Sequence, residues 1–146
     1  MTQPLDLDAG GPKEYWVVYS DGASRGNPGR ASYGAAVFDP QGSERHRTSG
    51  FLGITTNNVA EYRGLIAALE AALALGARRV EARMDSELLV RQAIGRYRVK
   101  NPGLIPLHRR VLNLRSQFDE VVFRHVPRER NKLADLLANE ALDSAT

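Results

Sequence analysis

Four acidic residues stand where the sequence predicts segments of regular structure to begin or end. Asp21 follows an apolar run and Asp85 follows a short alternating run, so each is expected at the carboxyl end of a strand, where open α/β sheets bind their ligands. Glu61 and Asp135 lie in the first turns of two segments with helical periodicity. If the two strands are neighbours, the four side chains converge, and clustered carboxylates repel one another unless cations neutralise them.

The chemistry of such a cluster is that of hard divalent cations. Mg²⁺ prefers oxygen ligands, whereas zinc sites use cysteine and histidine, and this chain has no cysteine and only three histidines. Two such ions about 4 Å apart stabilise the attacking and leaving oxygens of a phosphoryl displacement. Each acid taken singly has a simpler explanation, a helix cap or a surface charge. It is their combination that points to metal-assisted phosphoryl transfer.

The elements that must position these acids alternate between strand and helix patterns. Asn57 and Asn58 are expected to cap the first helix, and Ser86 the second. The first strand is apolar on both faces and therefore central, a glycine-rich turn follows it, and the third strand is polar enough for a sheet edge. The order predicts an α/β fold with a five-stranded mixed sheet, three antiparallel strands then two parallel ones, and helices on both faces. Strands are expected at residues 15–20, 32–39, 44–52, 79–84 and 120–126, the turn at residues 21–29, and helices at residues 58–75, 86–94, 105–118 and 132–142.

Length and composition predict a single domain, residues 14–143, after a disordered tail, residues 1–13. A chain of 146 residues can bury about two-thirds of its unfolded surface. The tail has neither a basic start nor an apolar core, so we do not expect a signal peptide, and no stretch is apolar enough to span a membrane. The absence of cysteine fits a reducing compartment. We therefore expect a cytoplasmic monomer with no obligate protein partner.

A basic segment runs from Arg91 to Phe118. Seven Lys or Arg residues occur there without an acid, although the net charge of the chain is only +3. This concentration of charge predicts a contact surface for a polyanion. The alternative is an ordinary solvated helix face.

Four segments are similar to the signatures of type 1 ribonuclease H, and they occur in the family's order. They are DGASRGNPG at residues 21–29, TNNVAEY at residues 56–62, MDS at residues 84–86 and NKLADLLA at residues 131–138. The resemblance extends from about residue 15 to residue 142 and implies a ribonuclease H-like fold. The segment between Arg91 and Ile105 is too short for the basic protrusion of some bacterial members, so the chain resembles a compact form. We expect its substrate binding to be weaker and to fall steeply with salt.

The resemblance implies a metal-dependent endonuclease that hydrolyses the RNA strand of RNA–DNA hybrids to 3′-hydroxyl and 5′-phosphate ends. Two Mg²⁺ ions would bind with the substrate, with Mn²⁺ as a substitute. His125 stands where the family has a loop histidine that moves protons or assists product release. It is alternatively a structural strand-end histidine, with a mobile cation supplied by residues 128–130 instead. The residues that match the family's metal ligands are Asp21, Glu61, Asp85 and Asp135.

The resemblance also implies a set of substrate contacts. Tyr97 stands where the family often packs a tryptophan against a deoxyribose, and its alternative is core packing. Many members carry glutamine at the position of Glu87. The glutamate here would place a negative charge facing the RNA. Thr56 matches a pocket for a DNA-strand phosphate, and Ser86 follows Asp85 in its motif. Small residues that let the backbone approach the 2′-hydroxyl of RNA are Gly22, Ala23, Ser24 and Gly26. Residues that match minor-groove contacts are Asn27, Asn57 and Asn58, the last two alternatively helix caps.

Two other functions remain open. A loosened pocket on the DNA side would give a broader nuclease that also cuts double-stranded RNA. The same fold could also serve as a non-catalytic nucleic-acid binding module, since a fold does not fix a function. Against this second alternative, a pure binder facing phosphates would lose affinity by carrying four carboxylates.

Overall fold

The computed structural model describes residues 14–145, and the predicted tail lies outside them. Within this range the chain contains no helix that is both long and apolar enough to cross a membrane. The element order is the one expected from the sequence. The elements are β1 (Tyr15–Gly26), β2 (Gly29–Phe38), β3 (Glu44–Thr55), α1 (Asn57–Ala74), β4 (Arg79–Met84), α2 (Glu87–Ala93), α3 (Ile105–Arg115), β5 (Glu120–His125), the 3₁₀ turn η1 (Arg128–Arg130) and α4 (Lys132–Ser144).

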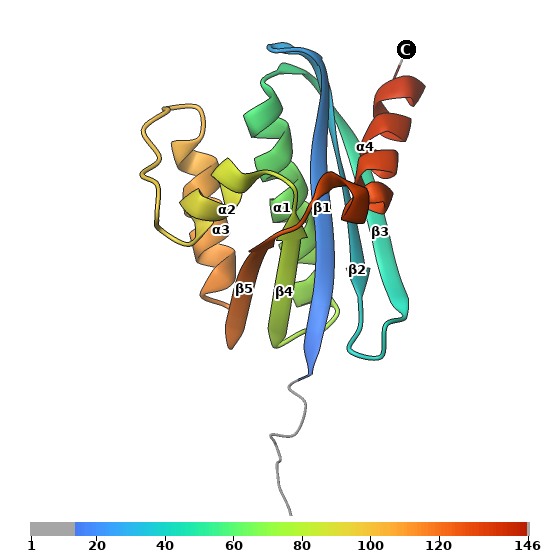
Figure 1. Cartoon of the computed structure of the whole chain (residues 1–146), viewed down its shortest axis with the longest axis vertical. Coiled ribbons are helices and arrows are strands. Elements are labelled where there is room, and N and C mark those ends of the chain that lie inside the picture. Colours follow the sequence, from blue (N-terminus) through green and yellow to red (C-terminus); the bar gives the residue numbers. More distant parts are fainter. Residues whose placement is uncertain (1–13, 146) are drawn as a thin grey trace, which may run out of the picture.

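The strands form one mixed sheet in the order β3-β2-β1-β4-β5 (Figure 1). β2 pairs antiparallel with β1 and β3, whereas β4 pairs parallel with β1 and β5. The predicted mixed sheet is therefore confirmed. The apolar β1 is the central strand, and the polar β3 lies at an edge, as its composition indicates.

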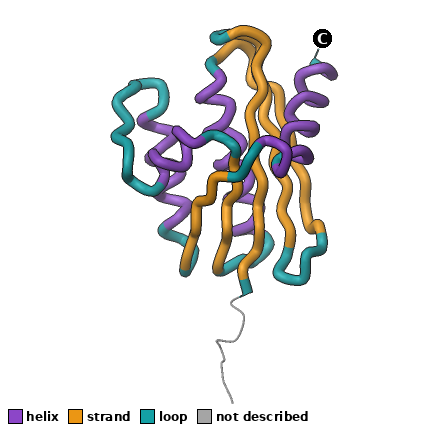
Figure 2. The backbone as a smooth tube through the Cα atoms, in the orientation of Figure 1, coloured by secondary structure: helices purple, strands orange, loops and turns teal. Residues whose placement is uncertain are grey.

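Helices cover both faces of this sheet (Figure 2). The surroundings of two glycines, one on β1 and one on β2, show which helix packs on which face. A Cβ on Gly22 would lie 2.5 Å from the backbone nitrogen of Glu61 on α1. A Cβ on Gly34, which pairs with Asp21, would lie 2.5 Å from the carbonyl oxygen of Ala134 on α4. Because neighbouring residues of a strand face opposite sides, α1 and α4 pack on opposite faces.

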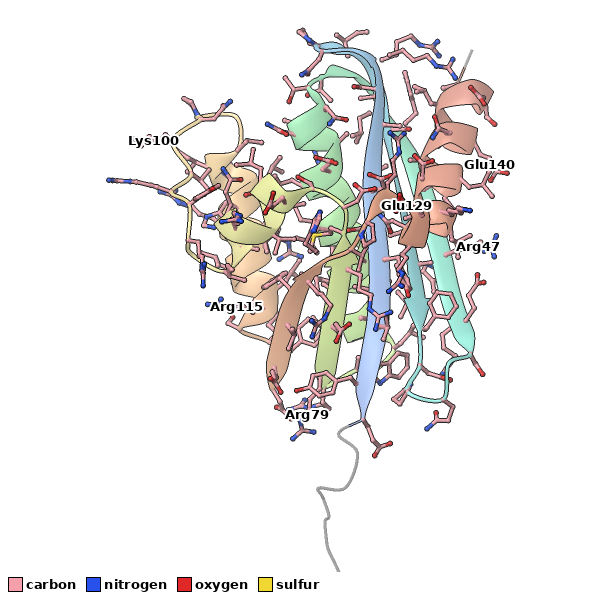
Figure 3. The ribbon with its side chains drawn as sticks, in the orientation of Figure 1. Arg47, Arg79, Lys100, Arg115, Glu129 and Glu140 are labelled. Atoms are coloured by element: carbon pink, nitrogen blue, oxygen red, sulfur yellow. The ribbon has the colours of Figure 1, made fainter. Side chains whose placement is uncertain are left out.

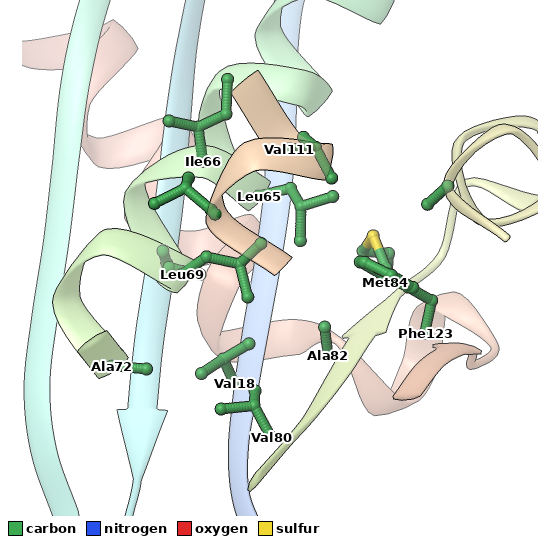
Figure 4. Close-up of a cluster of buried hydrophobic side chains, with 14 of the residues drawn as sticks. Val18, Leu65, Ile66, Leu69, Ala72, Val80, Ala82, Met84, Val111 and Phe123 are labelled. Atoms are coloured by element: carbon green, nitrogen blue, oxygen red, sulfur yellow. The ribbon is translucent and has the colours of Figure 1, made fainter. Parts of the chain in front are cut away.

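The main core lies between the sheet and the α1 face. Leu65 and Leu69 of α1 are fully buried against Val18 of β1 and Val80 of β4 (Figure 4). Val111 of α3 belongs to the same cluster. The helical spacing of the apolar residues on α1 therefore fixes which side of the helix meets the sheet, and it thereby fixes the direction of the polar residues at its start.

The glycine-rich segment after Ser20 differs from the prediction. It was expected to be a turn over residues 21–29, but β1 continues to Gly26 and pairs with β2 as far as Gly29. Only two residues, 27 and 28, connect the strands. Small residues and an Asn-Pro-Gly sequence occur both in a long turn and at the tip of a long hairpin. The pattern therefore did not reveal how far β1 extends before the chain turns.

The cap of α1 also differs from the prediction. Thr56, rather than Asn57 or Asn58, is the N-cap, and its side-chain oxygen accepts a hydrogen bond from the backbone N–H of Val59 at 3.2 Å. The helix starts one residue earlier than expected, so Glu61 lies just beyond its first turn. Ser86 caps α2 as predicted, accepting a hydrogen bond from the N–H of Leu89 at 3.2 Å.

Candidate active site

Three carboxylates from three elements meet at one end of the sheet. Asp21, Glu61 and Asp85 each offer an oxygen atom, and these atoms all lie within 4.8 Å of one another. The parallel pairing of β1 with β4 ends with Tyr19 opposite Arg83. Asp21 and Asp85 each follow two residues later, so the register itself brings them to the same level of the sheet.

Close packing of α1 against β1 brings in the third carboxylate. A Cβ on Gly64 would lie 2.7 Å from the carbonyl oxygen of Asp21, and Gly22 is similarly close to the backbone of Glu61. Glycine at both positions therefore allows the start of α1 to approach the strand more closely than any other residue pair would. The approach places the Glu61 side chain beside Asp21 and Asp85.

Asp135 comes to the same place from the other face of the sheet. It lies in the first turn of α4 and lines the same cleft, of about 410 Å³, although it is not part of the set within 4.8 Å. The side chain of Asn139 donates to the Asp135 carboxylate at 3.1 Å and to its backbone oxygen at 2.9 Å. The cleft is lined by Asp21, Gly22, Ala23, Ser24, Asn57, Glu61, Asp85, Arg128, Asp135 and Asn139.

The cluster is electrostatically unfavourable for the protein alone. Burial, together with the charges of Asp85 and Glu61, raises the pKa of Asp21 to about 8. Burial and the charge of Asp85 raise the pKa of Glu61 to about 7, despite a hydrogen bond from Ser86 that favours the charged form. Groups of this kind hold protons unless a cation replaces them. The all-oxygen ligand set therefore fits a hard divalent cation.

Some of the residues predicted to approach the RNA 2′-hydroxyl or the minor groove line this cleft. Gly22, Ala23, Ser24 and Asn57 line it. Asn27, at the tip of the β1–β2 hairpin, accepts a hydrogen bond from the Asn57 backbone N–H at 3.1 Å. This hydrogen bond joins the tip of the β1–β2 hairpin to the start of α1, and it brings together two residues that were predicted to contact the minor groove. Residues predicted here that do not line the cleft are Gly26, Asn27 and the exposed Asn58.

The other predicted substrate-binding residues, Thr56 and Tyr97 on the DNA side and Ser86 after Asp85, do not line the cleft, and two of them act as helix caps. The hydroxyls of Thr56 and Ser86 both accept the capping hydrogen bonds of their helices. Tyr97 is 47% exposed, and the guanidinium of Arg91 lies 5.3 Å from its ring centroid. The alternative of core packing is therefore wrong for Tyr97, whereas its role toward a deoxyribose stays a prediction.

The structure does not bring His125 into the cleft. His125 is the exposed last residue of β5 and is not among the residues that line the cleft. Arg128 lines the cleft instead, from η1, the turn that carries Glu129 in Figure 3. Among the described residues, the Arg128 guanidinium forms no ion pair or side-chain hydrogen bond. Of the two alternatives read from the sequence, the cation of residues 128–130 is the one placed next to the carboxylates.

Two asparagines beside Asp135 were not predicted as site residues. Asn139 stands four residues after Asp135, a spacing that places two side chains on one helix face, so its contact was readable from the sequence. Asn131 stands four residues before Asp135 and is 1% exposed. It is the first residue of the NKLADLLA segment, but its type and its place before the helix indicate only an ordinary helix cap.

Comparison with known proteins gives consistent similarities. Residues 19–141 match a family model described as reverse transcriptase-like. The chain is 48% identical over 130 residues to a bifunctional protein of Mycobacterium tuberculosis, covering 88% of this chain and 36% of that protein. It is 45% identical over 128 residues to ribonuclease HI of Halobacterium salinarum, covering 88% of this chain and 64% of that protein. The chain therefore spans only part of the length of these relatives.

Solved structures share the fold over nearly the whole domain. The N-terminal RNase H domain of the mycobacterial protein, solved as a fusion with maltose binding protein, has a TM-score of 0.88 and 46% identity, covering 91% of this chain and 96% of that chain. LC11-RNase H1, solved in complex with an RNA/DNA hybrid, has a TM-score of 0.84 and 44% identity, covering 89% of this chain and 98% of that chain.

Proposed function

The chain belongs to the ribonuclease H family, and on this premise we propose that it is an endonuclease that hydrolyses the RNA strand of RNA–DNA hybrids. The products would carry 3′-hydroxyl and 5′-phosphate ends. The observation that carries the proposal is the convergence of Asp21, Glu61 and Asp85, with Asp135 in the same cleft. The similarity to LC11-RNase H1, which was solved with an RNA/DNA hybrid, supports the substrate.

The four carboxylates would hold two Mg²⁺ ions when substrate is bound, with Mn²⁺ as a substitute. These ions would activate the attacking water and stabilise the leaving 3′-oxygen. The protein's part is to hold the ligands in place. The Gly22 N–H donates to the Asp21 carboxylate at 2.9 Å, and Asn139 donates to that of Asp135 at 3.1 Å. These hydrogen bonds orient two of the carboxylates before cations and phosphate would bind.

Substrate positioning follows from the residues around the carboxylates. The backbone from Gly22 to Ser24 lies open to the cleft and would approach the 2′-hydroxyl of the RNA strand. Arg128, without an ion-pair partner in the described part of the chain, would contact the phosphate at the reacting position. On the DNA side, the Tyr97 ring under Arg91 would meet a deoxyribose. We further propose that the protein acts as a cytoplasmic monomer.

One observation favours a broader nuclease as the second candidate. The Tyr97 ring is about half exposed rather than fixed in a pocket, so the surface that would reject a 2′-hydroxyl on the second strand is open. An enzyme with this surface would discriminate less between a hybrid and an RNA duplex.

The test is cleavage of a hybrid labelled on its RNA strand, with Mg²⁺, with Mn²⁺ and with EDTA, beside the Asp85→Asn variant. Asp119→Asn is the matched control, because Asp119 pairs with Arg78 on the surface away from the cleft. We expect metal-dependent cleavage by the wild type and by the control, and none by Asp85→Asn. Equal cleavage of a matched RNA duplex would favour the broader nuclease. Binding of hybrid without cleavage under either metal would overturn the catalytic assignment in favour of the binding module.

A further inference from the structure

Asn131 is hydrogen-bonded to two cleft-lining residues, Arg128 and Asp135, and to Ser20, the neighbour of a third, without lining the cleft itself. It is 1% exposed and lies between η1 and α4. Its backbone N–H donates to the carbonyl oxygen of Arg128 at 3.0 Å, and its own carbonyl oxygen accepts from the N–H of Asp135 at 3.1 Å. Its side-chain Nδ2 donates to the carbonyl oxygen of Ser20 at 2.9 Å, one residue before Asp21.

This side-chain bond is the link between two elements that enter the cleft from opposite directions. β1 carries Asp21, and α4 with the preceding turn carries Asp135 and Arg128. Among the side-chain hydrogen bonds of the described residues, the bond from Asn131 to Ser20 is the one that joins the first turn of α4 to β1. The other fixed contact between α4 and the sheet near this level is steric, at Gly34.

Helix stability does not explain an asparagine at this position. Asn131 occupies the N-cap position of α4, yet its side chain makes no capping hydrogen bond. Its Oδ1 is the one buried side-chain polar atom, within residues 14–145, that has no hydrogen-bond partner. A buried acceptor without a donor is unfavourable, whereas a capping serine or an apolar side chain would avoid that loss. Departures of this kind from local stability are expected where geometry serves a site.

We propose that Asn131 is a positioning residue, which fixes Asp135 and Arg128 relative to Asp21 by fastening the start of α4 to β1. The inference rests on the proposed function, because it concerns the ligand set of the same site. Asn131 touches neither the substrate nor a cation. It acts through the carboxylate of Asp135, whose distance from the other three carboxylates depends on where α4 begins.

The test uses two substitutions and a matched control. Asn131→Asp keeps the shape of the side chain but replaces the donor facing the Ser20 carbonyl by an acceptor, and Asn131→Ala removes the side chain. Ser32→Ala is the control, because the Ser32 hydroxyl is a buried donor from the sheet to α4 as well, at the Ala138 carbonyl one turn further along. All three variants lose one buried bond between the sheet and α4, but only the first two lose the bond from the start of α4 to the Ser20 carbonyl beside Asp21.

We expect both Asn131 variants to bind Mn²⁺ roughly tenfold to a hundredfold more weakly in calorimetric titrations, the range found for residues that orient metal ligands. Their kcat on the hybrid should fall by a similar factor while KM stays within about twofold, because Arg128 would act at the reacting phosphate and the other surfaces that would hold the hybrid are untouched. In the Asp135→Asn background, Asn131→Ala should add little to the loss of Mn²⁺ affinity. Ser32→Ala should lower the melting temperature without changing Mn²⁺ affinity.

Three results would overturn the inference. The first is unchanged Mn²⁺ affinity in both Asn131 variants, and the second is a loss no larger than that of Ser32→Ala at equal stability. A fully additive effect of Asn131→Ala in the Asp135→Asn background would also contradict it. These failures are distinct from failure of the proposed function, which would appear in the wild type as absence of metal-dependent cleavage.

Discussion

Asp21 and Glu61 are the residues at which burial and like charge act together, and they make the stability of the metal-free protein depend on pH. Their pKa values, about 8 and about 7 in the folded chain, lie above the ordinary values of 3.8 and 4.5. The folded state therefore binds more protons than the unfolded state between about pH 4 and pH 8, and stability must fall as pH rises through that window. This direction is opposite to that of a carboxylate in a salt bridge.

We expect the free energy of unfolding in EDTA to decrease by on the order of 5 kcal/mol from pH 5 to pH 8. The Asp21→Asn variant should lose most of this dependence and should be more stable than the wild type at pH 8, since it removes a buried charge. Urea denaturation at pH 5, 6.5 and 8 measures both. Asp119→Asn is the control, and a wild-type stability that rises with pH in EDTA would contradict the prediction. Saturating Mg²⁺ should reduce the decrease, because the cation replaces the protons.

Arg128 and His125 were alternative sources of a positive group, and substitution separates them. Arg128 lines the cleft, whereas His125 lies at the exposed end of β5. We expect Arg128→Ala to lower kcat/KM on the hybrid roughly tenfold or more, the loss of a charged hydrogen bond to phosphate. His125→Ala should change it less than about threefold. Arg130→Ala is the control, because Arg130 belongs to the same turn but does not line the cleft. The reverse ranking of Arg128 and His125 would restore the histidine to its expected role.

At the scale of elements, the close approach of α1 to β1 sets the geometry of the site. A methyl group on Gly22 would lie 2.5 Å from a backbone nitrogen and 2.6 Å from a backbone carbon of α1, which no side-chain movement can relieve. Gly22→Ala should therefore push α1 away and destabilise the fold by about 1–3 kcal/mol. Because Glu61 moves with the helix, we expect the activity to fall by more than the loss of stability explains. Gly103→Ala is the control, since its nearest neighbour is the end of the Asn101 side chain at 3.2 Å. A Gly22→Ala variant with wild-type kcat would show that the distance from Glu61 to Asp21 is not critical.

The elements themselves were largely predictable from the sequence, and the site was predictable where it depends on them. Apolar periodicity gives α1, and parallel register then brings Asp21 and Asp85 together, so no long-range information beyond strand adjacency was needed. The length of β1 was not predictable, because glycine-rich chemistry is the same in a turn and in a hairpin tip. The positions of His125 and Arg128 depend on the residue at which β5 ends and η1 begins, and a boundary of that kind is set by tertiary contacts rather than by local pattern.

At the scale of the whole molecule, the basic segment of residues 91–118 lies on the side away from α4. Lys100 on the loop after α2 and Arg115 at the end of α3 lie on that side, whereas Arg47 and Glu140 lie on the other (Figure 3). Arg91 and Arg110 pair with Glu87 and Glu70. The pair of Arg110 with Glu70 was not predictable, because it joins two helices, whereas Glu87 and Arg91 are four residues apart on one helix and their pairing was readable from the sequence. These ion pairs leave the charges of the exposed loop between α2 and α3, together with Arg109 and Arg115 of α3, available to a polyanion.

This distribution of charge predicts how hybrid binding responds to salt. Each phosphate that a cationic side chain neutralises makes the slope of log affinity against log salt steeper by about 0.9 on a B-form duplex. Arg98 and Lys100 are exposed and have no ion-pair partner among residues 14–145, so the double substitution to alanine should weaken binding and make the slope shallower by about 1 to 2. The double substitution of Arg45 and Arg47, exposed residues at the β3 edge, removes the same charge far from the loop and should leave the slope nearly unchanged.

Titrations with the inactive Asp85→Asn variant in EDTA, between about 50 and 200 mM salt, keep the substrate intact. Equal slopes for the two double variants would mean that net charge, and not this loop, governs the association, and a wild-type slope near zero would remove the polyanion surface altogether.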